Sequence, residues 1–414
     1  MRRRAFLASA TATFGAMAIL APPRSQAAQV GLKPMTGGAK SISVEERRAR
    51  IGRLQRAMAE RGCGAMIMEP GSSLDYFTGV QWRRSERTTA AVIPVKGEIV
   101  IITPAFEEPS VRETLAIEGE IRAWDEHESP FARIVGVLRD RSVMSGPIAF
   151  ESTTRLFIVE GVREAGPAYR VVSGDDLVRA IRLIKSPAEL ALMQIANDVT
   201  LSALRHVHTN VHAGMNPGEI GAMMNSATLA LGGAPEFSLV LINEASAYPH
   251  GSKQKQTLRE GSVILMDVGC TVHGYQSDIS RTWVLGKPSA KQQRVWDTVR
   301  RGQEIALASA KPGSSVGAID DAVRAYYETE GWGPGYHLPG LSHRTGHGIG
   351  LDGHEPPYLV HGDKTQLAPG MCFSDEPGIY IPGEFGIRLE DCWQMTETGP
   401  KLFTPLARSL EDPI

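Results

Sequence analysis

The apolar positions in the first half of the chain alternate between helical and strand-like spacing. From Val44 to Arg61, Ile51, Leu54 and Met58 recur on one face of an amphipathic helix. Further on, strand-like apolar runs alternate with helical stretches, the runs at 65–68, 90–95, 99–103 and 147–150 and the helical stretches at 107–118 and 130–139. This alternation predicts a small α/β domain with a parallel or mixed sheet.

Capping residues mark the start of a second domain. Ser186, Pro187 and Glu189 stand in N-cap, N1 and N3 register before a long helical pattern. Beyond them the pattern predicts helices at 187–213, 217–232, 289–310 and 315–330, and strands at 236–243, 262–269, 278–285, 371–377 and 385–395. We therefore expect an α/β (α+β) chain with domains at 44–180 and 186–405.

The N-terminus has the pattern of an export signal. Arg3-Arg4-Ala5-Phe6-Leu7 resembles a twin-arginine core, and an apolar stretch follows before the small-x-small sequence Ser25-Gln26-Ala27. We expect residues 1–28 to be a cleaved twin-arginine-type signal that delivers the folded protein to the periplasm or outside the cell, with residues 29–43 as a loose leader. An uncleaved anchor is the alternative, although the apolar stretch is short for a bilayer span.

Composition narrows the function only slightly. The 414 residues are 42% hydrophobic and 22% charged, enough for two cores. The net charge of −2 comes from 46 acidic and 44 basic residues without long runs of either sign, so no nucleic-acid partner is indicated. No later segment is apolar enough to cross a membrane. The four cysteines lack C-x-x-C spacing, which leaves one disulfide or buried free thiols as alternatives.

Two aspartates in the last third of the chain stand at strand ends. Asp267 closes the apolar run 263–267, and Asp278 follows eleven residues later in a similar setting. Alone, each fits a turn-capping role. A hairpin between them would bring both carboxylates together, and neither could stay buried and ionised there without a cation.

One histidine and two glutamates complete a set of metal-capable side chains. His347 lies among glycines, which is a weak signal by itself. Glu376 and Glu390 stand on apolar runs joined by a turn that contains Pro382 and Gly383. Four carboxylates and one imidazole form a mainly hard-donor set suited to two divalent cations bridged by water or hydroxide, so the sequence predicts a dinuclear metallohydrolase.

These motifs closely resemble those of the pita-bread metallopeptidases, in the branch of Xaa-Pro aminopeptidases and prolidases. The resemblance rests on Gly346-His347-Gly348-Ile349-Gly350-Leu351-Asp352-Gly353-His354-Glu355, Glu376-Pro377-Gly378-Ile379-Tyr380 and Ile387-Arg388-Leu389-Glu390-Asp391. It implies a creatinase-like N-terminal domain followed by a pita-bread catalytic domain, and commonly a homodimer or homotetramer.

The resemblance also implies metal-binding roles. Asp267 would chelate one metal, Asp278 and Glu390 would bridge both, and His347 with Glu376 would complete the second. A bridging hydroxide would attack the scissile carbonyl, and Glu376 would carry its proton to the leaving amine. Manganese is the expected ion, with cobalt, zinc or iron as alternatives.

Substrate roles follow from the same resemblance. His250 would contact the substrate near the nucleophile, His354 would stabilise the intermediate or receive the leaving proline, and His343 would line the proline pocket. An ordinary hydrogen-bonded histidine remains the alternative for each. Arg388 would orient carboxylates or substrate. We expect Asp375, where relatives commonly have an uncharged residue, to be a solvated or paired surface acid, with an effect on metal affinity as the alternative.

The expected function is an exported exopeptidase that cuts the Xaa-Pro bond of short proline-containing peptides. Dipeptidase and aminopeptidase activity both remain open. One alternative is a pita-bread lyase or hydrolase acting on a small metabolite. Another is a non-catalytic peptide-binding module, which the full set of metal-capable residues argues against.

Overall fold

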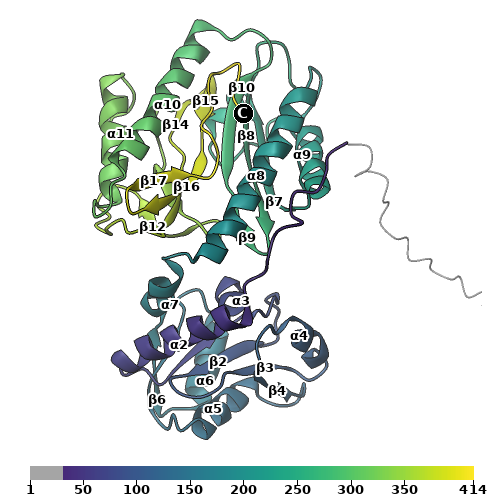
Figure 1. Ribbon diagram of the computed structural model, residues 1–414, viewed down its shortest axis with the longest axis vertical. Coiled ribbons are helices and arrows are strands. Elements are labelled where there is room, and N and C mark those ends of the chain that lie inside the picture. The colour runs from purple at the N-terminus through teal and green to yellow at the C-terminus, as the bar shows by residue number, and fades with distance from the viewer. Residues whose placement is uncertain (1–30) are drawn as a thin grey trace, which may run out of the picture.

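The computed structural model describes residues 31–414, which form two domains joined by α7 (Asp175–Arg182) and the start of α8 (Pro187–Asn210) (Figure 1). The expected signal segment, residues 1–28, lies outside the described residues. Within residues 31–414, none of the helices combines the length and the apolar character that crossing a bilayer requires.

The segment 31–43 packs against the C-terminal domain, so the expectation of a loose leader is wrong. The amide of Met35 donates to the carbonyl of Leu231 over 2.8 Å. Ile42 is 7% exposed, and Leu32 packs against the same apolar cluster. Burial of these two side chains offsets the entropy of ordering the segment.

The N-terminal domain is the predicted α/β domain with a mixed sheet, which has six strands and helices on both faces. Its strands lie in the order β4-β3-β2-β1-β5-β6, with β1–β2 and β2–β3 antiparallel and the other pairs parallel. Side chains of β1 alternate between two apolar clusters, as expected for a sheet covered on both sides. The elements are α2 (Val44–Glu60), β1 (Ala65–Met68), α3 (Ser72–Thr78), β2 (Ala90–Pro94), β3 (Val100–Pro104), α4 (Glu108–Thr114), β4 (Glu120–Trp124), α5 (Pro130–Asp140), β5 (Gly146–Phe150), α6 (Leu156–Ala165), β6 (Tyr169–Ser173) and α7 (Asp175–Arg182).

The C-terminal domain begins at the predicted capping box. The Ser186 hydroxyl accepts from the amide of Glu189, and the Glu189 carboxylate accepts from the amide of Ser186. The helices that follow are α8 (Pro187–Asn210), α9 (Pro217–Leu231), α10 (Ala290–Ser309) and α11 (Gly317–Thr329), with the 3-10 helix η1 (Asn243–Ala247).

Three sheets lie between these helices. One has the order β10-β8-β7, with β9 on β8, the second the order β12-β11-β13-β16-β17, and the third pairs β14 with β15. The single strand expected at 385–395 is two strands, because the chain leaves β15 at Leu389 and Glu390 before it joins a different sheet as β16. The strands are β7 (Ala234–Ile242), β8 (Val263–Val272), β9 (Tyr275–Gln276), β10 (Ile279–Val284), β11 (Gly346–Gly348), β12 (Glu355–Leu359), β13 (Cys372–Asp375), β14 (Gly378–Ile381), β15 (Phe385–Arg388), β16 (Asp391–Thr396) and β17 (Gly399–Leu402).

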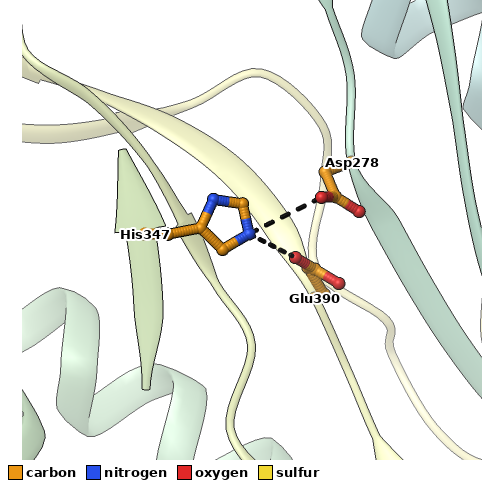
Figure 2. A group of neighbouring side chains, drawn as sticks. All are labelled: Asp278, His347 and Glu390. Atoms are coloured by element: carbon orange, nitrogen blue, oxygen red, sulfur yellow. Dashed lines mark ion pairs between the residues drawn. The ribbon is translucent and has the colours of Figure 1, made fainter. Parts of the chain in front are cut away.

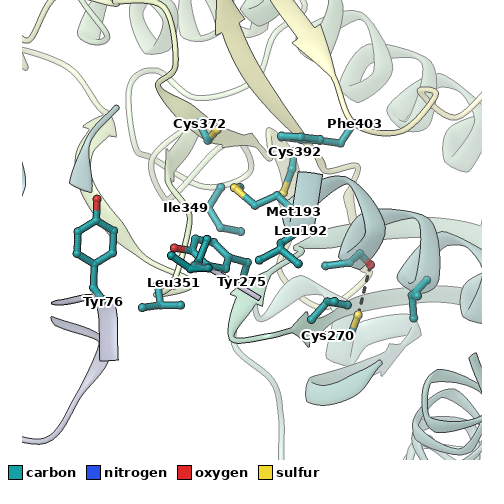
Figure 3. Packing of buried hydrophobic residues seen from close by; sticks show 14 of the residues in the cluster. Tyr76, Leu192, Met193, Cys270, Tyr275, Ile349, Leu351, Cys372, Cys392 and Phe403 are labelled. Atoms are coloured by element: carbon teal, nitrogen blue, oxygen red, sulfur yellow. Dashed lines mark hydrogen bonds between the residues drawn. The ribbon is translucent and has the colours of Figure 1, made fainter. Parts of the chain in front are cut away.

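One apolar cluster crosses the domain junction. Figure 3 labels Tyr76 of the N-terminal domain together with Leu192, Tyr275 and Leu351 of the C-terminal domain, all members of this cluster. Its cysteines are buried and free, as is every cysteine of residues 31–414, so the free-thiol alternative is the one observed. A shared core of this kind restricts motion of one domain against the other.

Candidate metal centre

The two aspartates come together through the predicted hairpin. Strands β8 and β10 are antiparallel with Ser280 opposite Asp267, and Asp278 stands immediately before β10. Asp278 is 5% exposed. Asp267 therefore lies within the central strand of this sheet rather than at a strand end, and it faces the same cavity as Asp278.

His347 stands at the centre of β11, where its neighbours must be small. A Cβ on Gly346 would lie 2.2 Å from the carbonyl oxygen of Ser374, and one on Gly348 would lie 2.4 Å from that of Glu355. Two glycines therefore let β11, which lies between β12 and β13, pass close to both neighbours and hold the imidazole in place. The Nδ1–H of His347 donates to the carbonyl of Gly348 over 3.0 Å, which leaves Nε2 free for the centre.

The two glutamates flank the hairpin of β14 and β15. Glu376 follows β13, and its amide donates to the carbonyl of Thr345 over 2.8 Å. Glu390 lies between β15 and β16, and its amide donates to the carbonyl of Ser280 over 3.0 Å. Backbone contacts to neighbouring strands thus set where each glutamate stands.

The imidazole and three of the carboxylates meet at one point. Nε2 of His347 lies 3.6 Å from Oδ2 of Asp278, 3.9 Å from Oε1 of Glu390 and 3.5 Å from Oε1 of Glu376. Figure 2 shows the first two carboxylates facing the ring. Ligand atoms of Asp278, His347 and Glu390 all lie within 4.8 Å of one another, a spacing that one cation could fill.

Asp267 lies on the same cavity wall but is held by Arg388. The guanidinium of Arg388 pairs with Oδ2 of Asp267 and also donates to the Ser280 hydroxyl over 2.9 Å. The other carboxylate oxygen, Oδ1, is buried without a partner. Asp267 thus lies beside the group formed by Asp278, His347 and Glu390 and is not a member of it.

The donor set fits divalent cations. Oδ1 of Asp267, Oδ1 of Asp278 and Oε1 of Glu390 are buried and have no hydrogen-bond partner within residues 31–414. An unpartnered buried carboxylate oxygen is costly unless a proton or a cation satisfies it. Oxygen donors with one imidazole suit hard or borderline divalent ions.

The pKa shifts have the same physical origin. Burial, together with neighbouring carboxylates, raises the pKa of Asp278 and of Glu390 well above their ordinary values. Burial likewise raises the pKa of Glu376 to about 7, even though Arg388 opposes the shift. Burial lowers the pKa of His347 to about 3, so its imidazole is neutral at physiological pH and available as a ligand. Positive charge brought by cations would stabilise the ionised carboxylates.

The three other candidate histidines have different surroundings. His250 and His354 line the cavity, and the His354 ring lies against that of His347 with centroids 4.0 Å apart. His343 uses both ring nitrogens inside the protein, Nε2 with the hydroxyl of Tyr380 and Nδ1 with the carbonyl of Arg344, each over 2.7 Å. These contacts agree with the alternative stated for His343, an ordinary hydrogen-bonded histidine.

Sequence reasoning missed two supporting hydroxyls. Ser280 donates to Oε2 of Glu390 over 2.7 Å, and the Tyr380 hydroxyl contacts Arg388 over 3.2 Å. Tyr380 belongs to the motif that begins at Glu376, and Ser280 stands two residues after Asp278, but neither residue type signals such a role without the fold. Asp375 requires a correction, because it is fully buried and both its oxygens lack partners within residues 31–414. Its strand lies in the interior of the domain, so no surface is available to it.

A cavity of about 1170 Å³ opens onto the metal-capable residues. Its walls come from both domains, with Trp82 and Arg179 on the N-terminal side and Phe237 and Tyr358 on the C-terminal side. The four carboxylates and His347 face this space. The volume suits a small molecule or a short peptide.

Two family descriptions match the chain. Metallopeptidase family M24 matches residues 191–397, and the Creatinase/Prolidase N-terminal domain matches residues 50–184. These matches confirm the expected order of a creatinase-like domain followed by a pita-bread domain.

Relatives and solved structures agree. An uncharacterized peptidase of Schizosaccharomyces pombe is 35% identical, covering 86% of this chain and 81% of the relative. The Xaa-Pro dipeptidase of Lactobacillus delbrueckii subsp. lactis is 28% identical, covering 87% of this chain and 98% of the relative. The crystal structure of dipeptidase PepE from Mycobacterium ulcerans has a TM-score of 0.80 and 28% identity, covering 88% of this chain and 97% of that one.

Proposed function

The chain belongs to metallopeptidase family M24, and on that premise we propose that it is an exopeptidase for the Xaa-Pro bond at the N-terminus of dipeptides or short peptides. The observation that carries the proposal is the group of buried carboxylates around His347, with unpartnered oxygens, at the wall of a cavity of peptide size. Family membership implies divalent metal. We propose two ions, with manganese as the native metal.

The residues that would hold the ions are Asp267, Asp278, His347, Glu376 and Glu390. When bound, two divalent cations would activate a water molecule for attack and polarise the scissile carbonyl. The protein supplies their positions, through the β8–β10 hairpin and the β14–β15 hairpin. Arg388 orients Asp267, because its buried guanidinium pairs with one oxygen of that carboxylate.

The proton transfers and substrate contacts fall to groups on the cavity wall. Glu376 lies beside His347 with its carboxylate toward the cavity, where it can take a proton from the attacking water and pass it to the leaving amine. His250 and His354 line the same space and can donate to the substrate carbonyl as negative charge develops on it. His343 acts through Tyr380, which it contacts directly.

Export belongs to the proposal as well. The twin-arginine-type pattern at residues 1–28 supports delivery of the folded enzyme to the periplasm or beyond. We also propose a homodimer or homotetramer, by the resemblance to pita-bread peptidases. Light scattering of the mature chain would measure the oligomer.

The test is release of the N-terminal residue from Ala-Pro and Ala-Pro-Ala, with Ala-Ala-Ala as the comparison substrate and with manganese or chelator present. Cleavage that depends on proline and is lost with chelator supports the proposal, and the ratio of the two proline substrates separates dipeptidase from aminopeptidase. Asp278→Asn should abolish cleavage, whereas Asp321→Asn, a surface change on α11, should leave it intact. Absence of cleavage by metal-loaded protein refutes the peptidase and favours a small-metabolite enzyme.

A further inference from the structure

The side chain of His354 is held by little besides its own backbone. It is exposed to the cavity, and its ring has no hydrogen bond to any residue in 31–414. Its ring stacks on that of His347, with an angle of 34° between the two ring planes. The position of this imidazole therefore depends on how the segment 351–355 is fixed.

Glu355 organises that segment from inside. Its Oε1 accepts from the amides of Leu351 and Asp352, over 3.1 Å each, so the chain curls around one carboxylate oxygen. A Cβ on Gly350 would lie 3.0 Å from the same oxygen, which shows how closely the backbone approaches it. His354 lies on this curl, between Asp352 and Glu355.

Arg182, the last residue of α7, connects the N-terminal domain to the segment 351–355, which we call the curl. Nη2 of Arg182 bonds to Oε1 of Glu355 and, over 2.8 Å, to Oδ2 of Asp352. Nη1 donates to the Ser73 hydroxyl over 3.1 Å, which ties the arginine to α3. The hydroxyl of Ser72, also on α3, bonds to Oδ1 of Asp352. The residues on either side of His354 are thus bound from the N-terminal domain.

The contact between Arg182 and Glu355 is a buried ion pair, and Glu355 has a second positively charged partner, Lys185. Burial would raise the pKa of Glu355, but Arg182 and Lys185 outweigh it and lower the pKa to about 2. Lys185 Nζ lies 2.8 Å from the other oxygen, Oε2. Because Lys185 belongs to the same junction and stays in place, loss of Arg182 does not leave Glu355 without a positive partner.

We propose that Arg182 is a positioning residue for His354, so that the N-terminal domain holds the cavity-facing curl 351–355 in its working arrangement. This inference rests on the proposed function for the part that concerns turnover. Arg182 does not touch the reacting atoms. It acts through Asp352 and Glu355.

The test compares Arg182→Met with Arg163→Met, which breaks a surface ion pair with Glu160 in the same domain. We expect Arg182→Met to lower kcat for the Xaa-Pro substrate about 10- to 100-fold, the range seen when groups that orient active-site ligands are removed. KM and bound metal should change less than about threefold, because the ligand residues are anchored elsewhere. Amide hydrogen exchange in peptides covering 349–356 should become faster. Arg163→Met should change none of these, and Arg182→Lys should recover part of kcat.

A second variant keeps the test decisive. If Arg182→Met does not fold, Asp352→Asn removes the partner on the curl, whose side chain is 46% exposed, and should shift kcat and exchange in the same direction by a smaller amount. Unchanged exchange, or unchanged kcat with a lower Tm alone, overturns the inference. If the wild type cleaves no peptide, the proposed function fails, whereas the exchange measurement still decides whether Arg182 holds the curl.

Discussion

Arg281 and Asp391 form a fully buried ion pair directly behind the candidate metal centre, and its removal should be among the most destabilising single changes in the C-terminal domain. Both side chains are 0% exposed, with Nη2 of Arg281 2.6 Å from Oδ1 of Asp391. Nη1 also donates to the carbonyl of Glu390 over 2.7 Å. The perturbation we choose is Arg281→Met, which keeps an unbranched stem and removes the charge and the donors.

The magnitude follows from what the variant leaves behind. Breaking a buried pair costs about 3–5 kcal/mol because one charge stays uncompensated. Thr404 and Gln303 still donate to Asp391, over 2.7 and 3.3 Å, which favours the lower end of that range. The carbonyl of Glu390 loses its donor, at about 1 kcal/mol. We therefore expect a loss of about 4 kcal/mol, and weaker metal binding because Glu390 is less firmly placed.

Urea denaturation of the chelated protein measures this loss. Tryptophan fluorescence follows the unfolding, and Trp393, two residues after Asp391, is one of the buried tryptophans that contribute to it. Adding Asp391→Asn to Arg281→Met should recover part of the loss, because the double variant has no unpaired buried charge. A loss under about 1 kcal/mol for Arg281→Met, or a double variant that loses the sum of the two single changes, would refute the reasoning.

Three further predictions concern metal, acid and glycine packing. Chelation should abolish activity and lower Tm, because each ion present at 100 times its Kd adds about 2.7 kcal/mol to the free energy of unfolding. A Tm that responds to neither chelator nor manganese contradicts a metal site. The folded-state pKa of Glu355, about 2, lies below its unfolded value of about 4.3, so its contribution is present above pH 4.3 and lost as pH falls through 2. Glu355→Gln should therefore flatten the fall in stability between pH 5 and 2 by up to about 3 kcal/mol in urea titrations, and an unchanged slope counts against the ion pairs. Gly346→Ala places a Cβ against a backbone carbonyl and should cost about 1–3 kcal/mol and weaken metal binding by calorimetry, while Gly136→Ala, with open space on α5, should be neutral or slightly stabilising.

Local patterns predicted much of the fold and of the candidate site. The period of the apolar residues predicted α2, and the capping box at Ser186 predicted the start of α8. The strand patterns around Asp267 and Asp278 indicated the hairpin that joins them. The burial of Asp375 was wrongly predicted, because an acid beside a predicted ligand has the same local pattern whether its strand is central or at the surface.

Local sequence patterns could not predict contacts between residues that lie far apart in the chain. Arg182 and Glu355 are 173 positions apart, and Arg281 and Asp391 are 110 apart. Their pairing depends on how the domains and sheets assemble, which no window of sequence contains. The break at Glu390 between β15 and β16 has the same origin, since the chain there passes from one sheet to another.

The packing of residues 31–43 has a mechanical consequence. Met35 bonds to Leu231 and Thr36 to Gly232, both at the end of α9, before the chain continues into α2. A force applied at the N-terminus therefore loads the catalytic domain first, although that domain comes second in sequence. In an optical trap with handles at both ends, the first rupture should be the release of this segment, with a length gain set by the residues between the handle and Ile42.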